Sequence, residues 1–175
     1  MITASMKEKQ GGGLGKAACG LEVFNDFIKN QVLVGIPEDN TARDNGEITN
    51  AALLYIHSNG SPLQGIPARP VIEPALAHNK ERLSQYMADA YSKALRGDTG
   101  GAMQALELTG MAGQTAAQEW FTNPANGWPP LKESTLQSSS KSHKGKRGDK
   151  GEPRPLVDSG NLRKAITYVV RREGE

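Results

Sequence analysis

The sequence contains a single cysteine and no long apolar run, and both absences narrow the class of protein. Cys19 stands alone among 175 residues, so it can form neither a disulfide within the chain nor a cysteine cluster for a metal. One unpaired cysteine is typical of a reducing compartment. No stretch approaches the roughly eighteen apolar residues of a transmembrane helix, and the opening residues carry no signal-peptide hydrophobic region. We therefore expect a soluble protein made in the cytoplasm.

Aromatic residues are also scarce, and charge is nearly balanced. Aromatics make up 5% of the chain against 20 glycines and 10 prolines, so loops take a large share of the length and the core is small. A net charge of +2 is too weak to indicate a nucleic-acid-binding protein unless basic residues cluster locally. The length suits one domain. We expect residues 1–13 to be a flexible N-terminus and residues 14–175 a single domain that includes a long basic loop at about 123–155.

Two runs rich in β-branched residues predict strands. QVLVGIP, residues 31–37, alternates Val32, Val34 and Ile36 with other residues before a proline ends the run. AITYVVRR, residues 165–172, is a second run of this kind. We expect the two strands to pair in a small antiparallel sheet.

Apolar residues at steps of three and four predict helices between these strands. The expected helices span residues 14–30, 47–60, 73–96 and 102–121, and Ser159 is placed to cap a helical turn over Leu162 and Ala165. The predicted fold class is therefore α+β, with a small antiparallel β-sheet packed against the two long helices and a long extended or flexible loop before the C-terminal strand.

Each of the four predicted helices carries an apolar stripe that we expect to face the core. In chain order, the stripes contain Leu14, Ala17 or Ala18, Leu21, Phe24 and Ile28; Ile48, Ala51 or Ala52, Tyr55 and Ile56; Leu76, Leu83, Met87, Ala90 and Ala94; and Met103, Leu106, Gly110, Gly113, Ala117 and Trp120. Glycine on a packed face lets another element approach closely.

Local patterns that suggest catalysis are incomplete. GGGLGKA resembles a phosphate-binding loop, but Gln10 stands where the first glycine is needed and Ala17 where a magnesium-binding hydroxyl is needed. The three histidines have no cysteine or carboxylate partner at metal-ligand spacing, and no GxSxG element frames a serine nucleophile. We expect no catalytic residues, no metal site and no cofactor, and hence a protein that is not an enzyme.

Basic residues cluster in the serine- and glycine-rich segment after the predicted helices. The candidates for contact with DNA or with an acidic surface are Lys141, Lys144, Lys146, Arg147 and Lys150. No aromatic residue lies among them on which a base could stack. The alternative interpretation is a solvated, mobile loop that makes no such contact.

The stretch HSNGSPLQGIPARPVIEPAL, residues 57–76, is rich in proline and contains no catalytic cluster. Proline fixes φ and removes an amide donor, so GIPARP is expected to run extended across the surface. Arg69, between two prolines, is placed to reach a carboxylate on a partner. The alternative is that this segment only connects two helices and that Arg69 pairs within the subunit.

Three blocks in this sequence carry a family resemblance. They are ITNAALLYIHSNGSPLQGIPARPVIEPAL, GWPPLKESTL and RPLVDSGNLRKAITYVV, in that order. Together they resemble the tail-completion or virion-morphogenesis family of tailed bacteriophages. The matching residues are Tyr55, His57, Gly60, Ile66, Pro67, Ala68, Arg69, Pro70 and Pro74, then Trp128, Pro130, Leu131 and Thr135, then Leu156, Asp158, Gly160, Leu162, Arg163 and Ile166. Ser58, Asn59, Val71 and Ser159 depart from the family pattern.

The resemblance implies a structural virion protein of the head-tail junction, a tail-completion or neck component. It implies a homo-oligomeric ring, with a hexamer favoured, that docks head-joining and tail-tube proteins, with DNA in transit as a further contact and no membrane partner. Such a protein is assembled in the host bacterial cytoplasm and resides in the tail or neck of the virion. The expected partner-docking residues are Ile66, Pro67, Arg69, Pro70, Trp128 and Leu131.

Other functions stay open at this point. A tail terminator, which caps the tail tube, is also a small ring-forming α+β protein. A DNA-binding accessory protein would act through the basic cluster and would bind DNA with a steep dependence on salt. A small hydrolase with unrecognised catalytic residues is a third alternative.

Overall fold

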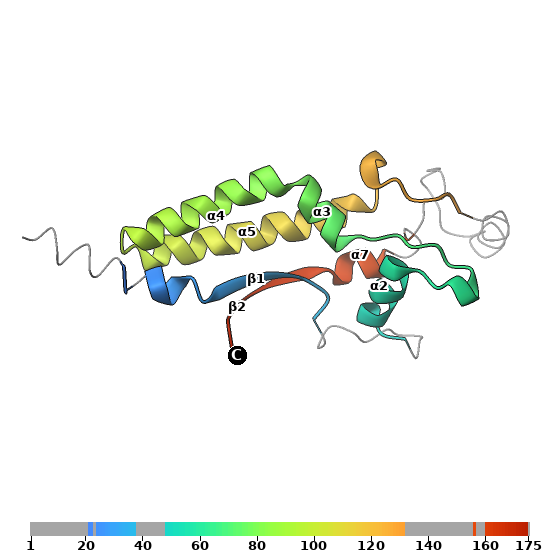
Figure 1. Ribbon diagram of the computed structural model, residues 1–175, viewed down its shortest axis with the longest axis horizontal. Coiled ribbons are helices and arrows are strands. Elements are labelled where there is room, and N and C mark those ends of the chain that lie inside the picture. The colour runs from blue at the N-terminus through green and yellow to red at the C-terminus, as the bar shows by residue number, and fades with distance from the viewer. Residues whose placement is uncertain (1–20, 23, 38–47, 132–155, 157–159, 175) are drawn as a thin grey trace, which may run out of the picture.

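The computed structural model describes residues 21–22, 24–37, 48–131, 156 and 160–174. Two long helices, α4 (Lys80–Leu95) and α5 (Thr99–Trp120), lie side by side, and a sheet formed by β1 (Asn30–Gly35) and β2 (Thr167–Arg172) packs against α5 (Figure 1). The predicted α+β class is therefore confirmed, as are the small antiparallel sheet and its packing against long helices.

The two strands lie near opposite ends of the sequence and pair with each other. Val32 lies opposite Val170 and Val34 opposite Tyr168. The backbone N–H of Glu173 donates to the carbonyl of Lys29 at 2.7 Å, which extends the same register by one more pair. The predicted pairing of the two β-branched runs is confirmed.

Helix α5 packs against the sheet through glycine. A methyl group added at Gly110 would overlap the ring of Tyr168 on β2, and one added at Gly113 would lie 2.9 Å from the side chain of Val34 on β1. The helix begins after Asp98, whose side chain accepts a hydrogen bond from the N–H of Gly101 at 2.9 Å. The apolar stripe of this helix was predicted correctly except at Met103, which is exposed.

The helix predicted for residues 73–96 is in fact two helices. Helix α3 (Ile72–His78) ends at Asn79, whose φ of −100° and ψ of 13° leave the helical region, and α4 begins at the next residue. The Asn79 side chain donates to the carbonyl of Ala75 at 2.9 Å and satisfies the end of α3. The prediction of one continuous helix was wrong, because this chain turns to place α3 against α5.

Helix α2 (Asn50–Asn59) was predicted at nearly the right place but with the wrong face inward. Thr49 caps it by accepting a hydrogen bond from the N–H of Ala52 at 3.1 Å. The buried residues are Asn50 and Leu54, whereas Tyr55 from the predicted stripe is 71% exposed. The helix packs against α7 (Asn161–Ala165), so its inner face is set by that contact.

The hydrophobic core has two clusters at the two ends of α5. The first contains Leu54, Val71, Ala75, Ala117, Trp120, Phe121, Leu162 and Ile166. The second contains Phe27, Ala90, Ala94, Ala102, Ala105 and Leu106. Alanine at the contact lets α4 and α5 approach closely, which explains how a chain poor in aromatic residues builds a packed helix pair.

The remaining predicted elements are described in part. Residues 21–22 and 24–27 are helical, whereas residues 14–20 and 23 of the helix expected at 14–30 lie outside the described residues. The end of that helix was predicted too late, because residues 28–29 form a turn and Asn30 begins β1. Leu21 and Ile28 of its predicted stripe are exposed. The helical turn predicted over Leu162 and Ala165 is present as α7, and both side chains are buried. Ser159 lies outside the described residues, and Gly160 is the residue before the helix. Two short 3₁₀ helices, η2 (Pro62–Gln64) and η3 (Pro124–Asn126), complete the element order.

Candidate interaction site

The loop that follows α2 is fixed by its own backbone. Ser61 and Ile66 form an isolated antiparallel bridge with N···O distances of 2.8 and 2.9 Å. Gly65 has a left-handed conformation, which favours glycine. Gly60 has a φ of 75°, and a Cβ there would lie 2.7 Å from the backbone nitrogen of Ala68. The chain therefore doubles back closely enough that no other residue fits at Gly60.

Arg69 is buried and joins two segments of its own chain. Only 6% of the residue is exposed. Its Nη2 atom donates to the carbonyl of Pro129 at 3.1 Å and lies 3.4 Å from the carbonyl of Pro130, and its backbone N–H donates to the carbonyl of His57 at 2.6 Å. The expectation that Arg69 meets a partner's carboxylate is wrong for this subunit, since the guanidinium is enclosed and bonded to its own chain. The alternative of internal pairing is the one observed.

Trp128 closes the same contact from the other side. Its indole Nε1 donates to the carbonyl of Pro70 at 3.1 Å, and its ring meets that of Phe121 edge-on with centroids 5.8 Å apart. Each of the two proline-containing segments thus supplies a side-chain donor to a carbonyl of the other. Proline cannot donate from its own nitrogen, so these carbonyls are natural acceptors for side chains.

Burial of this contact lowers the pKa values of its two basic groups, His57 and Arg69. Loss of water around His57, together with the nearby charge of Arg69, lowers the pKa of His57, and burial lowers the pKa of Arg69. The Nδ1 atom of His57 and the Nε atom of Arg69 are buried without a hydrogen-bond partner. Neutral His57 is the form that this environment favours.

The three blocks that carry the family resemblance converge on one core cluster. Val71 follows the first block's proline segment, Trp128 belongs to the second, and Leu162 and Ile166 belong to the third; all four belong to or pack against the first core cluster. Segments separated by about a hundred residues therefore depend on one another for their packing. The structure brings together the expected docking residues Arg69, Pro70 and Trp128 in this way.

The other candidate residues differ in exposure and in whether they are described. Ile66, Pro67 and Leu131 are partly buried, and Pro70 is exposed. The basic candidates Lys141, Lys144, Lys146, Arg147 and Lys150 lie outside the described residues. The surface available for docking in this region therefore consists of the exposed and partly buried residues around the contact between Arg69 and Trp128. The contact itself is buried.

Sequence reasoning missed the most exposed apolar side chain of the described residues. Leu63, in η2 at the tip of the loop closed by Ser61 and Ile66, is 102% exposed. Tyr55 on α2 is also well exposed. The sequence signal was present, since a leucine between a proline and a Gln-Gly pair sits in a turn and cannot belong to a helical stripe.

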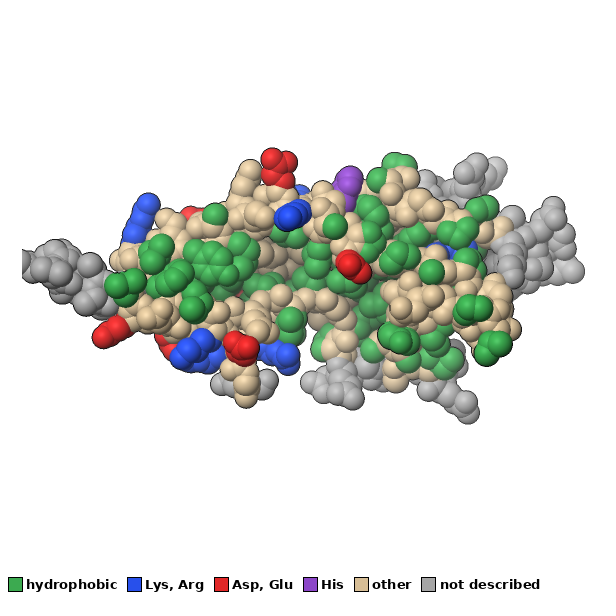
Figure 2. Space-filling model, viewed as in Figure 1, with side chains coloured by type: hydrophobic (Ala, Val, Ile, Leu, Met, Phe, Trp, Pro, Cys, Tyr) green, Lys and Arg blue, Asp and Glu red, His purple; other side chains and the backbone are tan. Residues whose placement is uncertain are grey.

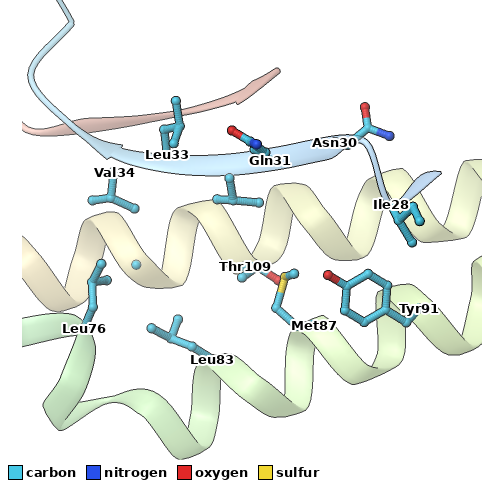
Figure 3. A pocket seen from close by; sticks show the side chains of 12 residues that line it. Ile28, Asn30, Gln31, Leu33, Val34, Leu76, Leu83, Met87, Tyr91 and Thr109 are labelled. Atoms are coloured by element: carbon cyan, nitrogen blue, oxygen red, sulfur yellow. The ribbon is translucent and has the colours of Figure 1, made fainter. Parts of the chain in front are cut away.

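A long apolar groove lies between β1 and α4, with α5 as its floor. It has a volume of about 520 Å³, and its lining consists of Ile28, Asn30, Gln31, Val32, Leu33, Val34, Leu76, Leu83, Met87, Tyr91, Thr109 and Gly113. Figure 2 shows hydrophobic side chains gathered on this face of the molecule. In Figure 3, Leu83 and Met87 point from α4 toward the strand, and Val34 points back from β1.

Some kinds of site are absent from the described part of the chain. Its histidine, cysteine, aspartate and glutamate side chains form no group of three or more that could hold a metal ion. None of the described helices combines the length and the apolarity needed to cross a membrane.

Comparison with known proteins gives no assignment. No family model matches the chain, and no curated protein or solved structure matches it either.

Proposed function

We propose that this chain is a structural protein of the head-tail junction of a tailed bacteriophage. It acts as a tail-completion or neck component that assembles into a ring and docks neighbouring head or tail proteins. It works through geometry and contact, with no catalysis, cofactor or metal. Its place of action is the tail or neck of the virion.

The observation that carries the proposal is the contact between the resembling blocks. Arg69 of IPARP and Trp128 of GWPP exchange hydrogen bonds with each other's segments, and the LVDSGNLR block packs into the same cluster through Leu162. Residues that resemble one family in three separate stretches thus form a single structural unit. This is the arrangement expected if the resemblance reflects a shared fold and not chance matches.

Exposed apolar groups give the ring part of the proposal its physical support. Leu63 in η2 and Tyr55 in α2 both lie at the α2 end of the molecule and are well exposed (Figure 1). Large apolar side chains exposed at one end of a subunit suit a contact with a different surface of the next subunit, and such head-to-tail contacts close into rings when the rotation between subunits permits.

Two measurements test the proposal. Mass photometry and negative-stain electron microscopy of the purified chain should reveal a closed ring, and immunogold labelling of phage particles from the strain that encodes it should mark the neck. The proposal would be refuted if the chain stays monomeric at all concentrations and the antibody labels no particle. Tight DNA binding with a steep salt dependence, in the absence of rings, would favour the DNA-binding alternative instead.

A further inference from the structure

We propose that the groove between β1 and α4 receives an extended strand from another protein chain, which adds to the free edge of β1 as a third strand of the sheet. This inference does not depend on the ring, because it concerns the isolated subunit and one face of it. The strand alternates apolar and polar residues and carries no charged side chain on the face toward the helices.

The backbone of β1 offers unused hydrogen-bonding groups along the groove. The bond between Glu173 and the carbonyl of Lys29 marks a hydrogen-bonded pair, and such pairs alternate along an antiparallel ladder. Gln31 and Leu33 therefore bond to β2, whereas the N–H and C=O groups of Val32 and Val34 face away from it. In the described part of the chain no other strand lies on that side of β1.

The sheet is too narrow for the helices beneath it. Two packed helices form a layer about 20 Å wide, whereas two strands about 4.8 Å apart cover about 10 Å of it. The strands lie over α5, and the α4 side of the layer is left with Leu83 and Met87 only partly buried and Tyr91 36% exposed (Figure 3). One added strand at the edge of β1 would cover this apolar row.

The size of the groove decides between a strand and a whole subunit. A groove as long as β1, about 20 Å, and about 10 Å wide offers roughly 200 Å² on each side. A stable interface between two folded subunits buries about 1,200–2,000 Å² in total. The groove alone therefore suits a single extended segment, held by main-chain hydrogen bonds and by apolar side chains at every second position.

The helices also exclude a second sheet of the same kind as the occupant. A copy of this chain that paired its own β1 or β2 with the free edge would bring its α5 under the new strand, since α5 packs beneath both strands. That space is already bordered by α4 of the first subunit. The occupant must therefore be a strand without a helical layer on that face, as an extended arm provides.

A selection from a displayed library of random peptides about twelve residues long, twice the length of β1, tests the inference on the full chain. Bound peptides should share apolar residues at three alternating positions. Val32→Pro removes an edge N–H that β2 does not use, and Met87→Lys places a charge in the groove. Each should weaken the binding of the selected peptides by about tenfold or more. Gln85→Lys, which adds the same charge to an exposed position of α4, should leave binding unchanged.

Circular dichroism and thermal unfolding of the three variants must show that each is folded. Recovery of no binding peptide, of peptides without the alternation, or of peptides that bind Val32→Pro and Met87→Lys as well as the parent chain would overturn the inference. Residue-resolved hydrogen exchange gives a second readout. Bound peptide should slow amide exchange at Val32 and Val34 far more than at Gln31 and Leu33. Equal slowing of both sets would contradict strand addition.

Discussion

The ring of Tyr168 on β2 lies directly over the backbone of Gly110 on α5, so closely that a Cβ at Gly110 would overlap it. This contact sets the distance between the sheet and the helix that supports it. The phenol of Tyr168 also forms a hydrogen bond with the side chain of Glu107, which lies one turn before Gly110 on α5. This hydrogen bond, followed by burial, raises the pKa of Tyr168. The tyrosine is therefore held in place at both its ring and its hydroxyl.

Gly110→Ala should destabilise the protein by about 1–3 kcal/mol, because the added methyl forces the ring of Tyr168 or the whole strand to move. Alanine would otherwise favour a helix by about 1 kcal/mol over glycine, so the net sign reports the clash. Gly100→Ala is the matched control, since it lies in the first turn of α5, where an added methyl group would lie 4.0 Å from Oδ1 of Asp98, an ordinary contact distance, and it should be neutral or stabilising. Urea unfolding of both variants decides, and equal stabilisation by the two would show that the sheet yields without cost.

Arg69→Ala should lower the stability of the isolated subunit by about 1.5–3 kcal/mol, as expected for loss of hydrogen bonds from a charged donor. It leaves the carbonyls of Pro129 and Pro130 without their donor. Arg69→Lys should recover only part of the loss, because an ammonium group lacks the planar fork of arginine. Arg82→Ala, at an exposed position of α4, is the control. An unchanged melting temperature in Arg69→Ala would return this residue to a docking role.

Stability should fall in mild acid because of His57. Burial, and then the charge of Arg69, lowers the pKa of His57 in the folded protein, whereas the unfolded chain titrates near the ordinary value of about 6.5. Between these two values the unfolded state binds more protons. The contribution of neutral His57 is thus complete above about pH 6.5 and is lost as the pH falls through the folded pKa.

The measurement is the free energy of unfolding in urea at about pH 7.5 and about pH 5.5, on either side of the ordinary histidine pKa. His57→Gln should lose less stability than the parent chain over this interval. The same pH dependence in the parent and in His57→Gln would contradict the assignment.

Features that depend on local pattern could be predicted from the sequence, and features that depend on distant partners could not. The β-branched runs around Val34 and Val169 predicted both strands and their pairing, because alternation of this kind suits a pleated surface. Gly113 in an apolar stripe predicted a close approach, which Val34 makes. These signals lie within a few residues of the structure that they specify.

The break at Asn79 and the burial of Arg69 lacked such local signals. No proline or glycine marks Asn79, and the apolar spacing runs on from Leu76 to Leu83, so only the packing of α3 against α5 ends the first helix. Arg69 is bonded to carbonyls 60 and 61 residues away. A charged residue between two prolines looks exposed until the position of that distant segment is known.

If subunits assemble into the proposed ring, Leu63→Asp should abolish its formation while leaving the subunit as stable as before. Leu63 is completely exposed at the tip of a loop closed by the Ser61–Ile66 bridge, so the folded subunit gains nothing from its apolar side chain. Burying a leucine in a partner's pocket contributes about 1.5–3 kcal/mol, and a loop already fixed loses little conformational entropy on docking. Aspartate would forfeit that gain and add the cost of burying a charge.

Gln64→Asp is the matched control in the same short helix, because it adds the same charge beside the apolar tip. Mass photometry reports assembly and thermal unfolding reports stability. Rings that form equally well from both variants would show that Leu63 faces solvent in the assembly, and a large loss of melting temperature in Leu63→Asp would show that it packs within the subunit.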